Sequence, residues 1–530
     1  MTRRPTLEEA RTRLRELGYL DAGVEKLLFR PVFEGRGGAL LPAVLIGAAA
    51  AALSAVAAVE VSEPGFSGSI TAAVVLFVHM FLANLAPAAI LGLALGWLAD
   101  RSRAPGVAAT VAGLCAAMTV VGLWVAGTYG LARELPLRSL LWGIPVALAA
   151  LLLAAAVRLA FLARAFAHSG ALPGRAIRRV FAAAVAAGLL VAVLFPSRHE
   201  TPAVPAPQPS PRPLPIVVLA VDGLDLDGQG KPPGIAEMLS HGATGWWPAQ
   251  HLSPPEIWTD LSTGVSSRRH GVRTLTRVRP AASPLALRPP FGTSWYLRRL
   301  GPALRLVANA PVSGSDRRSL AFWEVSASAG IPSLSVGWWA SAPWPGATVI
   351  DNRAILARAA DGVGADRAAA VLFEEAMKKG YGVGTVYLPG CDITRSDAAT
   401  RGAALARIEE LLRDHSERAA RSESVLVVLS ADSHPSSSGA LGRMTVFDGI
   451  GQARSVQIRP ADVAPSILAR AGVPAARDLS GRPVAPLFLP GSLETATVDT
   501  YGPRIVAPSA TPASTDREYL EKLRSLGYLK

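Results

Sequence analysis

Three aspartates, Asp222, Asp392 and Asp432, each lie at or just beyond the end of a short apolar, β-branched segment. Carboxylate oxygens are the ligands that hard divalent cations take in proteins. If the three segments are neighbouring parallel strands, their carboxyl ends meet at one edge of a sheet, where ligands gather. The spacing therefore predicts a site for a divalent metal ion at this edge. The alternative is that each aspartate only caps a turn or the next helix.

Ser253 is the candidate nucleophile. It precedes Pro254 in the segment SPPEIWT, which is expected to open a helix. A hydroxyl at a helix N-terminus beside metal ions can become an alkoxide that attacks phosphorus. Ser253 and Glu256 also have the spacing of a capping box, and on spacing alone this structural interpretation is preferred. Thr259, further along the same segment, is a weaker candidate nucleophile.

The elements that must position these residues have an α/β pattern. Residues 216–221, 383–388 and 425–429 are short β-branched runs, as found in strands buried on both faces. Between them lie helical patterns such as residues 403–420, in which leucines and an isoleucine form one apolar stripe. This alternation predicts a mostly parallel sheet with helices on both faces.

The composition shows that this domain is not the whole chain. Of 530 residues, 50% are hydrophobic and 18% are charged, which is more apolar than a soluble domain needs. Two cysteines, Cys115 and Cys391, exclude a disulfide framework. Collagen-like, coiled-coil and wholly disordered chains are excluded as well, and so is a small soluble enzyme.

The apolar excess lies in the N-terminal third. Each of five successive runs approaches or exceeds the ~20 residues that a helix needs to cross a bilayer. The runs are residues 40–59, 70–98, 107–126, 140–162 and 180–195. We therefore expect a cytoplasmic N-terminal segment (1–37), an α-helical membrane domain of about five spans (38–196) and a lipid bilayer as partner.

The basic residues set the expected orientation. The net charge of +13 would permit a nucleic-acid binder, but many of the arginines flank the apolar runs. Those before the first run and in the second and fourth connections place the N-terminus in the cytoplasm by the positive-inside rule. We expect no nucleic-acid partner. The expected location is the plasma (inner) membrane, with the C-terminal domain outside the cytoplasm, or periplasmic.

A Pro-rich linker, residues 197–213, separates the two parts; residues 202–215 hold seven prolines in fourteen positions. The domain of residues 214–530 follows. One short pattern occurs at both ends of the chain, as LRELGYL at residues 14–20 and LRSLGYL at 523–529. Each copy is typical of a short amphipathic helix that ends at a glycine.

Seven motifs in residues 214–530 resemble, in family order, the alkaline phosphatase superfamily and, within it, the type I phosphodiesterase/nucleotide pyrophosphatase group. They are VLAVDG (218–223), SPPEIWTDLSTG (253–264), RHG (269–271), VGWWA (336–340), YLPGCD (387–392), DVAPSILARAGVP (462–474) and DLSGRP (478–483). The resemblance implies that family's α/β fold. It also implies hydrolysis of phosphate esters by two metal ions, usually zinc, with a Thr or Ser nucleophile.

Carried over residue by residue, Asp222, Asp392 and Asp432 match metal ligands of the family. Ser253 is nearest to the nucleophile but stands one residue early, with Pro254 in the nucleophile's place. The family's histidine ligands are largely replaced.

Ser396 occupies the place of one histidine, and Ser433 that of another, with His434 one residue late. A hydroxyl is a poor substitute for imidazole as a zinc ligand. His434 is therefore the fourth candidate ligand.

Three functions follow from these observations. The first is a membrane-anchored phosphodiesterase or phosphatase acting on a small-molecule, lipid or glycan phosphate ester. The second is a catalytically degenerate pseudoenzyme that serves as a binding or assembly module. The third is a transferase similar to the phosphoethanolamine transferases.

Overall fold

The computed structural model describes residues 214–224, 226, 232–248, 252–280, 301–305, 307–432, 441–449, 454–502, 504 and 513–529, with positions 9, 12, 13, 16 and 17 near the N-terminus. The five predicted spans and the Pro-rich linker lie outside these residues. Among the described helices, none combines the length and the apolar composition needed to cross a bilayer. The chain forms two compact units, residues 1–199 with 278–309 and residues 200–277 with 310–530. The second unit holds every candidate site residue that the structure describes.

An eight-stranded sheet forms the centre of this unit, in the order β10-β2-β9-β8-β1-β7-β5-β6. Its strands are β1 (Ile216–Asp222), β2 (Ala243–Pro248), β5 (Ser333–Val336), β6 (Ala347–Ile350), β7 (Val383–Leu388), β8 (Val425–Ala431), β9 (Leu441–Phe447) and β10 (Ser455–Gln457). From β8 to β6 all neighbours are parallel, whereas β9 runs antiparallel to both β8 and β2. The prediction of a mostly parallel sheet is confirmed, and the three predicted strands correspond to β1, β7 and β8.

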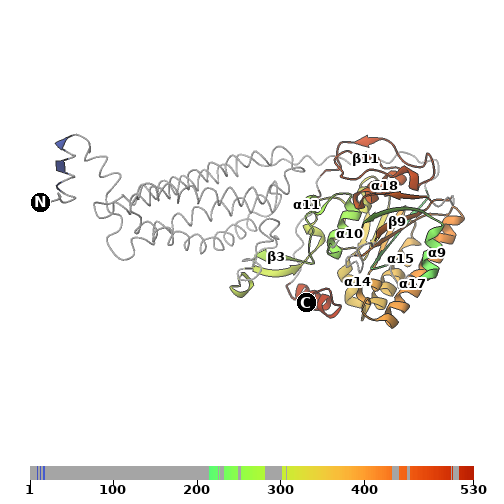
Figure 1. The fold of residues 1–530 in the computed structure, drawn as a ribbon, viewed down its shortest axis with the longest axis horizontal. Coiled ribbons are helices and arrows are strands. Elements are labelled where there is room, and N and C mark those ends of the chain that lie inside the picture. Colours follow the sequence, from blue (N-terminus) through green and yellow to red (C-terminus); the bar gives the residue numbers. More distant parts are fainter. Residues whose placement is uncertain are drawn as a thin grey trace. The chain divides into compact units, whose positions relative to one another are not determined.

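Helices cover both faces of the sheet. Figure 1 shows α9 (Pro233–Ser240), α15 (Gly362–Met377) and α17 (Ala398–Ala420) on one side, and α10 (Pro254–Thr263) and α18 (Val463–Arg470) on the other. The predicted helix of residues 403–420 is the larger part of α17.

The remaining helices and strands are short. They are α11 (Ser267–His270), α13 (Phe322–Ser328), α14 (Asn352–Arg358), α16 (Gly390–Ile393), α19 (Ala513–Ser525), β3 (Thr276–Pro280), β4 (Val307–Pro311), β11 (Ala475–Ala476) and β12 (Thr497–Val498). Single 3-10 turns occupy Gly314–Asp316, Pro460–Asp462 and Ala485–Leu487. Strands β3 with β4, and β11 with β12, form two separate two-stranded sheets.

The core lies on both faces of the central strands. Every residue of β1, β7 and β8 is buried, as expected of β-branched runs in a parallel sheet. On the side of α10, Trp258 packs edge-on against Tyr387 (5.2 Å between ring centroids) and against Trp338 (5.7 Å). Such aromatic pairs add to the stability gained from area burial. This packing holds α10 against β7 and the segment that follows β5.

Candidate functional site

The three candidate aspartates gather at the carboxyl ends of three adjacent strands. Asp222 is the last residue of β1, Asp432 directly follows β8, and Asp392 lies in α16 just after β7. Gly223 makes the close approach possible. It has φ of +73°, and a Cβ at this position would lie 2.7 Å from the backbone nitrogen of Asp392. A side chain there would push α16 away, so this glycine lets Asp392 come close to Asp222.

Arg395 joins two of these carboxylates. Its Nη2 donates to Oδ1 of Asp392 at 2.9 Å and to Oδ1 of Asp432 at 2.5 Å, and its Nη1 donates to Oδ2 of Asp432 at 3.1 Å. Burial lowers the pKa of Arg395, but the hydrogen bonds and charges of Asp432 and then Asp392 outweigh it and raise the pKa above its ordinary value. The guanidinium therefore remains charged between the two carboxylates.

Asp222 is fully buried beside this ion pair. The Tyr387 hydroxyl donates to its Oδ2 at 2.7 Å, and the Trp339 indole donates to the Tyr387 oxygen at 2.9 Å. Burial, followed by the Asp392 carboxylate, raises the pKa of Asp222 well above its ordinary value, against the lowering effect of the Tyr387 hydrogen bond. The Tyr387 hydroxyl and the Trp339 indole thus form a buried hydrogen-bonded chain that fixes the orientation of Asp222.

The described residues do not fit the pair of zinc ions that the family resemblance implies. No group of three or more His, Cys, Asp or Glu side chains in the described part of the chain is arranged to hold a metal ion. Ser396 stands at the position after Asp392 where the family resemblance calls for a histidine. Arg395 donates hydrogen bonds to oxygens of both Asp392 and Asp432. His434 and Ser433 lie outside the described residues, so their predicted roles stay predictions.

The two candidate nucleophiles are placed differently. Ser253 precedes α10, but its hydroxyl donates to the carbonyl oxygen of Arg273 at 2.5 Å. The predicted capping box is wrong, because the Ser253 side chain turns to the Arg273 carbonyl and accepts no backbone N–H of α10. Thr259 is fully buried inside α10, and its Oγ1 has no hydrogen-bond partner among the described residues.

Asp366, on α15, supports the loop that carries Asp392. Its Oδ1 accepts the backbone N–H of Gly390, the first residue of α16, at 2.8 Å. Burial raises the pKa of Asp366 to about 8, although the Gly390 hydrogen bond and the charge of Arg407 lower it. The carboxyl is therefore largely neutral at pH 7. Asp366 therefore holds α16 in position through this hydrogen bond and adds no charge to the site.

His270 has a structural role. It ends α11, its Nε2 lies 2.6 Å from Oδ1 of Asp260, and its Nδ1 accepts the Val272 N–H at 3.1 Å. Because Nδ1 is an acceptor, the imidazole is neutral with its proton on Nε2. Burial lowers its pKa, which is consistent with this state.

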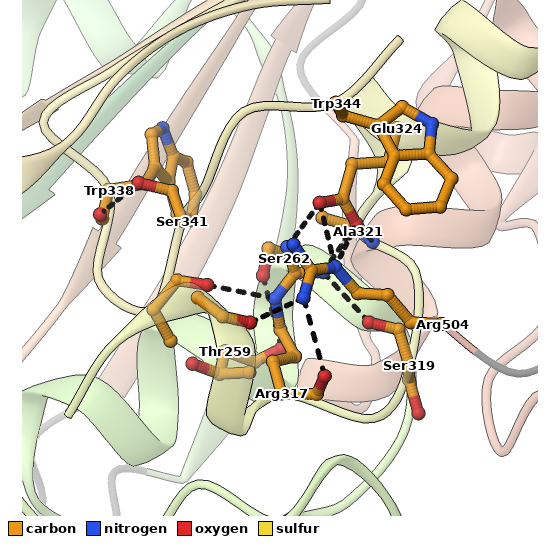
Figure 2. Close-up of polar contacts among 12 residues, drawn as sticks. Thr259, Ser262, Arg317, Ser319, Ala321, Glu324, Trp338, Ser341, Trp344 and Arg504 are labelled. Atoms are coloured by element: carbon orange, nitrogen blue, oxygen red, sulfur yellow. Dashed lines mark hydrogen bonds and ion pairs between the residues drawn. The ribbon is translucent and has the colours of Figure 1, made fainter. Parts of the chain in front are cut away.

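A second charged cluster lies in the core near α13. Figure 2 shows the guanidinium groups of Arg317 and Arg504 turned toward the carboxylate of Glu324. Arg317 makes two hydrogen bonds to Glu324, at 2.7 and 2.8 Å, and Nε of Arg504 makes two, at 2.9 and 3.1 Å. Although burial raises the pKa of Glu324, the charges of Arg317 and then Arg504 bring it below its ordinary value. Burial and the neighbouring Arg317 lower the pKa of Arg504 to about 10.

Sequence reasoning missed the residues that complete both clusters. The spacing of Asp392 and Arg395, three apart in a helical turn, was a usable local signal. No such signal exists for Glu324 and Arg504, which are 180 positions apart.

No family model matches the sequence, and no curated protein matches it either. Solved structures similar to it include members of the alkaline phosphatase superfamily. One, from Vibrio parahaemolyticus, has 12% identity and a TM-score of 0.34 over 54% of this chain and 73% of its own. Murine ectonucleotide pyrophosphatase/phosphodiesterase 5 has 15% identity and a TM-score of 0.27 over 41% of this chain and 56% of its own.

A third structure comes from a study of a Bacteroides thetaiotaomicron genetic locus for glycosaminoglycan metabolism. It has 14% identity and a TM-score of 0.31 over 53% of this chain and 78% of its own. At these identities and TM-scores, the likeness assigns no function.

Proposed function

We propose that residues 214–530 form a metal-independent binding or assembly module, built on the architecture of a phosphoester or sulfate-ester hydrolase. The observation that carries this proposal is the guanidinium of Arg395 between Asp392 and Asp432. A permanent positive charge from the chain itself stands where the family resemblance calls for a metal cation.

The chemistry of the ligands supports the proposal. For a divalent ion to bind between Asp392 and Asp432, Arg395 must leave both carboxylates. This step costs free energy, because the charge-assisted hydrogen bonds of the guanidinium are lost. Replacement of an imidazole by Ser396 removes a strong zinc ligand that would otherwise offset this cost.

The nucleophile position supports it as well. Pro254, which takes the nucleophile's place in the resemblance, has no hydroxyl to donate. The Ser253 hydroxyl already donates to a backbone carbonyl, which cannot act as a general base. Thr259 is buried away from solvent and substrate.

The test is an assay of the purified full chain in detergent. Substrates are p-nitrophenyl phosphate, bis-p-nitrophenyl phosphate and p-nitrophenyl sulfate, each with Zn²⁺, Mn²⁺ or Mg²⁺, and bound metal is measured by elemental analysis. We expect no turnover above the blank and no stoichiometric metal. Turnover that disappears in Asp222→Ala, or one or two bound metal ions per chain, would overturn the proposal. Transfer of a phosphorylated headgroup from a lipid donor would overturn it equally.

We propose further that the module is held outside the cytoplasm by the N-terminal membrane domain. The apolar runs of residues 40–195 and the distribution of arginines around them support this arrangement. In right-side-out vesicles, added protease should digest the domain of residues 214–530 and leave a tag at the N-terminus intact. Protection of the domain would contradict the proposed topology.

A further inference from the structure

The C-terminal segment, residues 513–529, reaches the carboxylate site. The ring of Tyr528 packs edge-on against Trp339, with 5.6 Å between ring centroids and an interplanar angle of 83°. Its hydroxyl oxygen is buried. The Trp339 indole in turn donates to the Tyr387 hydroxyl, which donates to Asp222. Tyr528 therefore lies over the same Trp339 and Tyr387 that hold Asp222.

Separate contacts anchor the segment beside the site. Leu523 is fully buried and Leu526 nearly so, which gives α19 an apolar face toward the domain. Arg353, on α14, donates to Oδ1 of Asp516 at 2.8 Å and lies 4.9 Å from the ring centroid of Tyr519. Gly527, with φ of +83°, turns the chain after α19 so that Tyr528 enters the site.

The spacing of the buried residues in this segment is similar to that of a helical peptide ligand. Leucines at an i, i+3 spacing and one aromatic anchor at a turn are typical of a helical peptide that binds an apolar groove. Trp339 and α14 form the wall that this segment contacts. The chain itself supplies the occupant, at a high effective concentration because it is covalently attached.

We infer that the C-terminal segment of residues 513–529 is a displaceable cover, packed against Trp339 and α14, and that its release opens the Asp222–Asp392–Asp432 site. The inference rests on the proposed function, because it names what occupies the module's site when no other ligand is bound. In the closed state, Tyr528 excludes external ligands from Asp222. A partner that binds the carboxylate site must first compete with this segment.

Hydrogen exchange measured by mass spectrometry on the full chain tests this inference. A chain that ends at residue 512 should exchange roughly tenfold faster in residues 336–341 and 387–396, because the covered site becomes locally mobile. Tyr528→Ala should show a smaller effect in the same direction, and Tyr528→Phe, which keeps the ring on Trp339, should resemble the wild type. Glu518→Ala, at an exposed position of α19, is the matched control.

A synthetic peptide of residues 513–530, added to the shortened chain, should restore slow exchange, and the same peptide with Tyr528→Ala should not. Exchange in β8 and β9 should stay unchanged throughout, which distinguishes an open site from an unfolded domain. Unchanged exchange in the shortened chain, or a peptide that fails to restore protection, would overturn the inference. Both readouts are independent of metal content and turnover, so the cover and the proposed function can fail separately.

Discussion

The two buried charge clusters of this domain have opposite compositions. Within the described residues, the first sets two carboxylates, those of Asp392 and Asp432, on one guanidinium, that of Arg395. The second sets two guanidinium groups, those of Arg317 and Arg504, on one carboxylate. The Arg395 side chain is 31% exposed, whereas Glu324 and Arg504 are at 0%. The first cluster lies at the edge of the sheet, where ligands bind, and the second lies inside the core.

The difference in exposure separates a cluster whose ion pairs can exchange with solvent or a ligand from one whose ion pairs are sealed in the core. Removal of one partner from the second cluster leaves a buried charge without a counter-charge. The role of this cluster is therefore to hold the segment around Arg504 against α13. The cation of the first cluster, Arg395, is partly exposed to solvent. We therefore assign function to the first cluster and stability to the second.

Glu324→Gln should lower the free energy of unfolding by about 3–5 kcal/mol, because it leaves two buried guanidinium groups without a counter-charge. Urea unfolding followed by tryptophan fluorescence measures this loss. Glu423→Gln, which breaks an exposed pair with Arg421, is the control and should leave the unfolding curve unchanged. A loss below about 1 kcal/mol in Glu324→Gln would show that the core cluster is not needed for stability.

The pH dependence of the free energy of unfolding should show the titration of Asp366, which supports the loop of the first cluster. Because its pKa is raised to about 8 in the folded state, its contribution to stability is fully present below the unfolded pKa and is lost as the pH rises toward 8. The slope from this single group is at most about 1.4 kcal/mol per pH unit.

Asp366→Asn keeps an acceptor for the Gly390 N–H and does not titrate, so it should flatten this part of the curve. Thermal unfolding between pH 5 and pH 8 gives the comparison. An identical slope in wild type and variant would show that Asp366 is already ionised in the folded protein.

Arg395→Ala should cost about 1–2 kcal/mol of stability, because charge-assisted hydrogen bonds to two carboxylates are lost from a partly exposed site. It should also create a dependence on divalent cations that the wild type lacks. With Arg395 absent, millimolar Mg²⁺ or Ca²⁺ can bind Asp392 and Asp432 and raise the melting temperature.

Arg413→Ala, which removes an exposed arginine of α17, is the matched control for the loss of charge. If the wild type is stabilised by these cations as much as Arg395→Ala, Arg395 does not act as a substitute for the metal.

Thr259→Val should raise stability by up to about 1 kcal/mol, because it replaces a buried hydroxyl that has no partner in the described structure by a methyl group of similar shape. Thr263→Val is the opposite case, because its hydroxyl donates to the Thr259 carbonyl oxygen at 2.6 Å, and it should lower stability by about 1 kcal/mol. Loss of any hydrolytic activity in Thr259→Val would instead identify this residue as a nucleophile.

Local patterns in the sequence predicted much of the fold. The β-branched runs that became β1, β7 and β8 are buried along their full length, and that burial makes them recognisable. Helix α17 begins five residues before the predicted start, because Asp397 caps it by accepting from the backbone of Ala399 and Thr400. The capping box of Ser253 was predicted wrongly because a tertiary acceptor, the Arg273 carbonyl, competes for the same hydroxyl.

Burial and strand length leave a pattern in neighbouring residues, so the mostly parallel sheet and the three aspartates at the ends of its strands could be predicted from the sequence. The cation that meets Asp392 and Asp432 could not, because contacts through space in the folded domain select it. Arg395 contacts Asp432 from 37 positions away. Tyr528 packs on Trp339, whose indole donates to the Tyr387 hydroxyl that binds Asp222. The partner of a long side chain depends on which residues the fold brings within its reach, so neighbouring residues in the sequence do not reveal it.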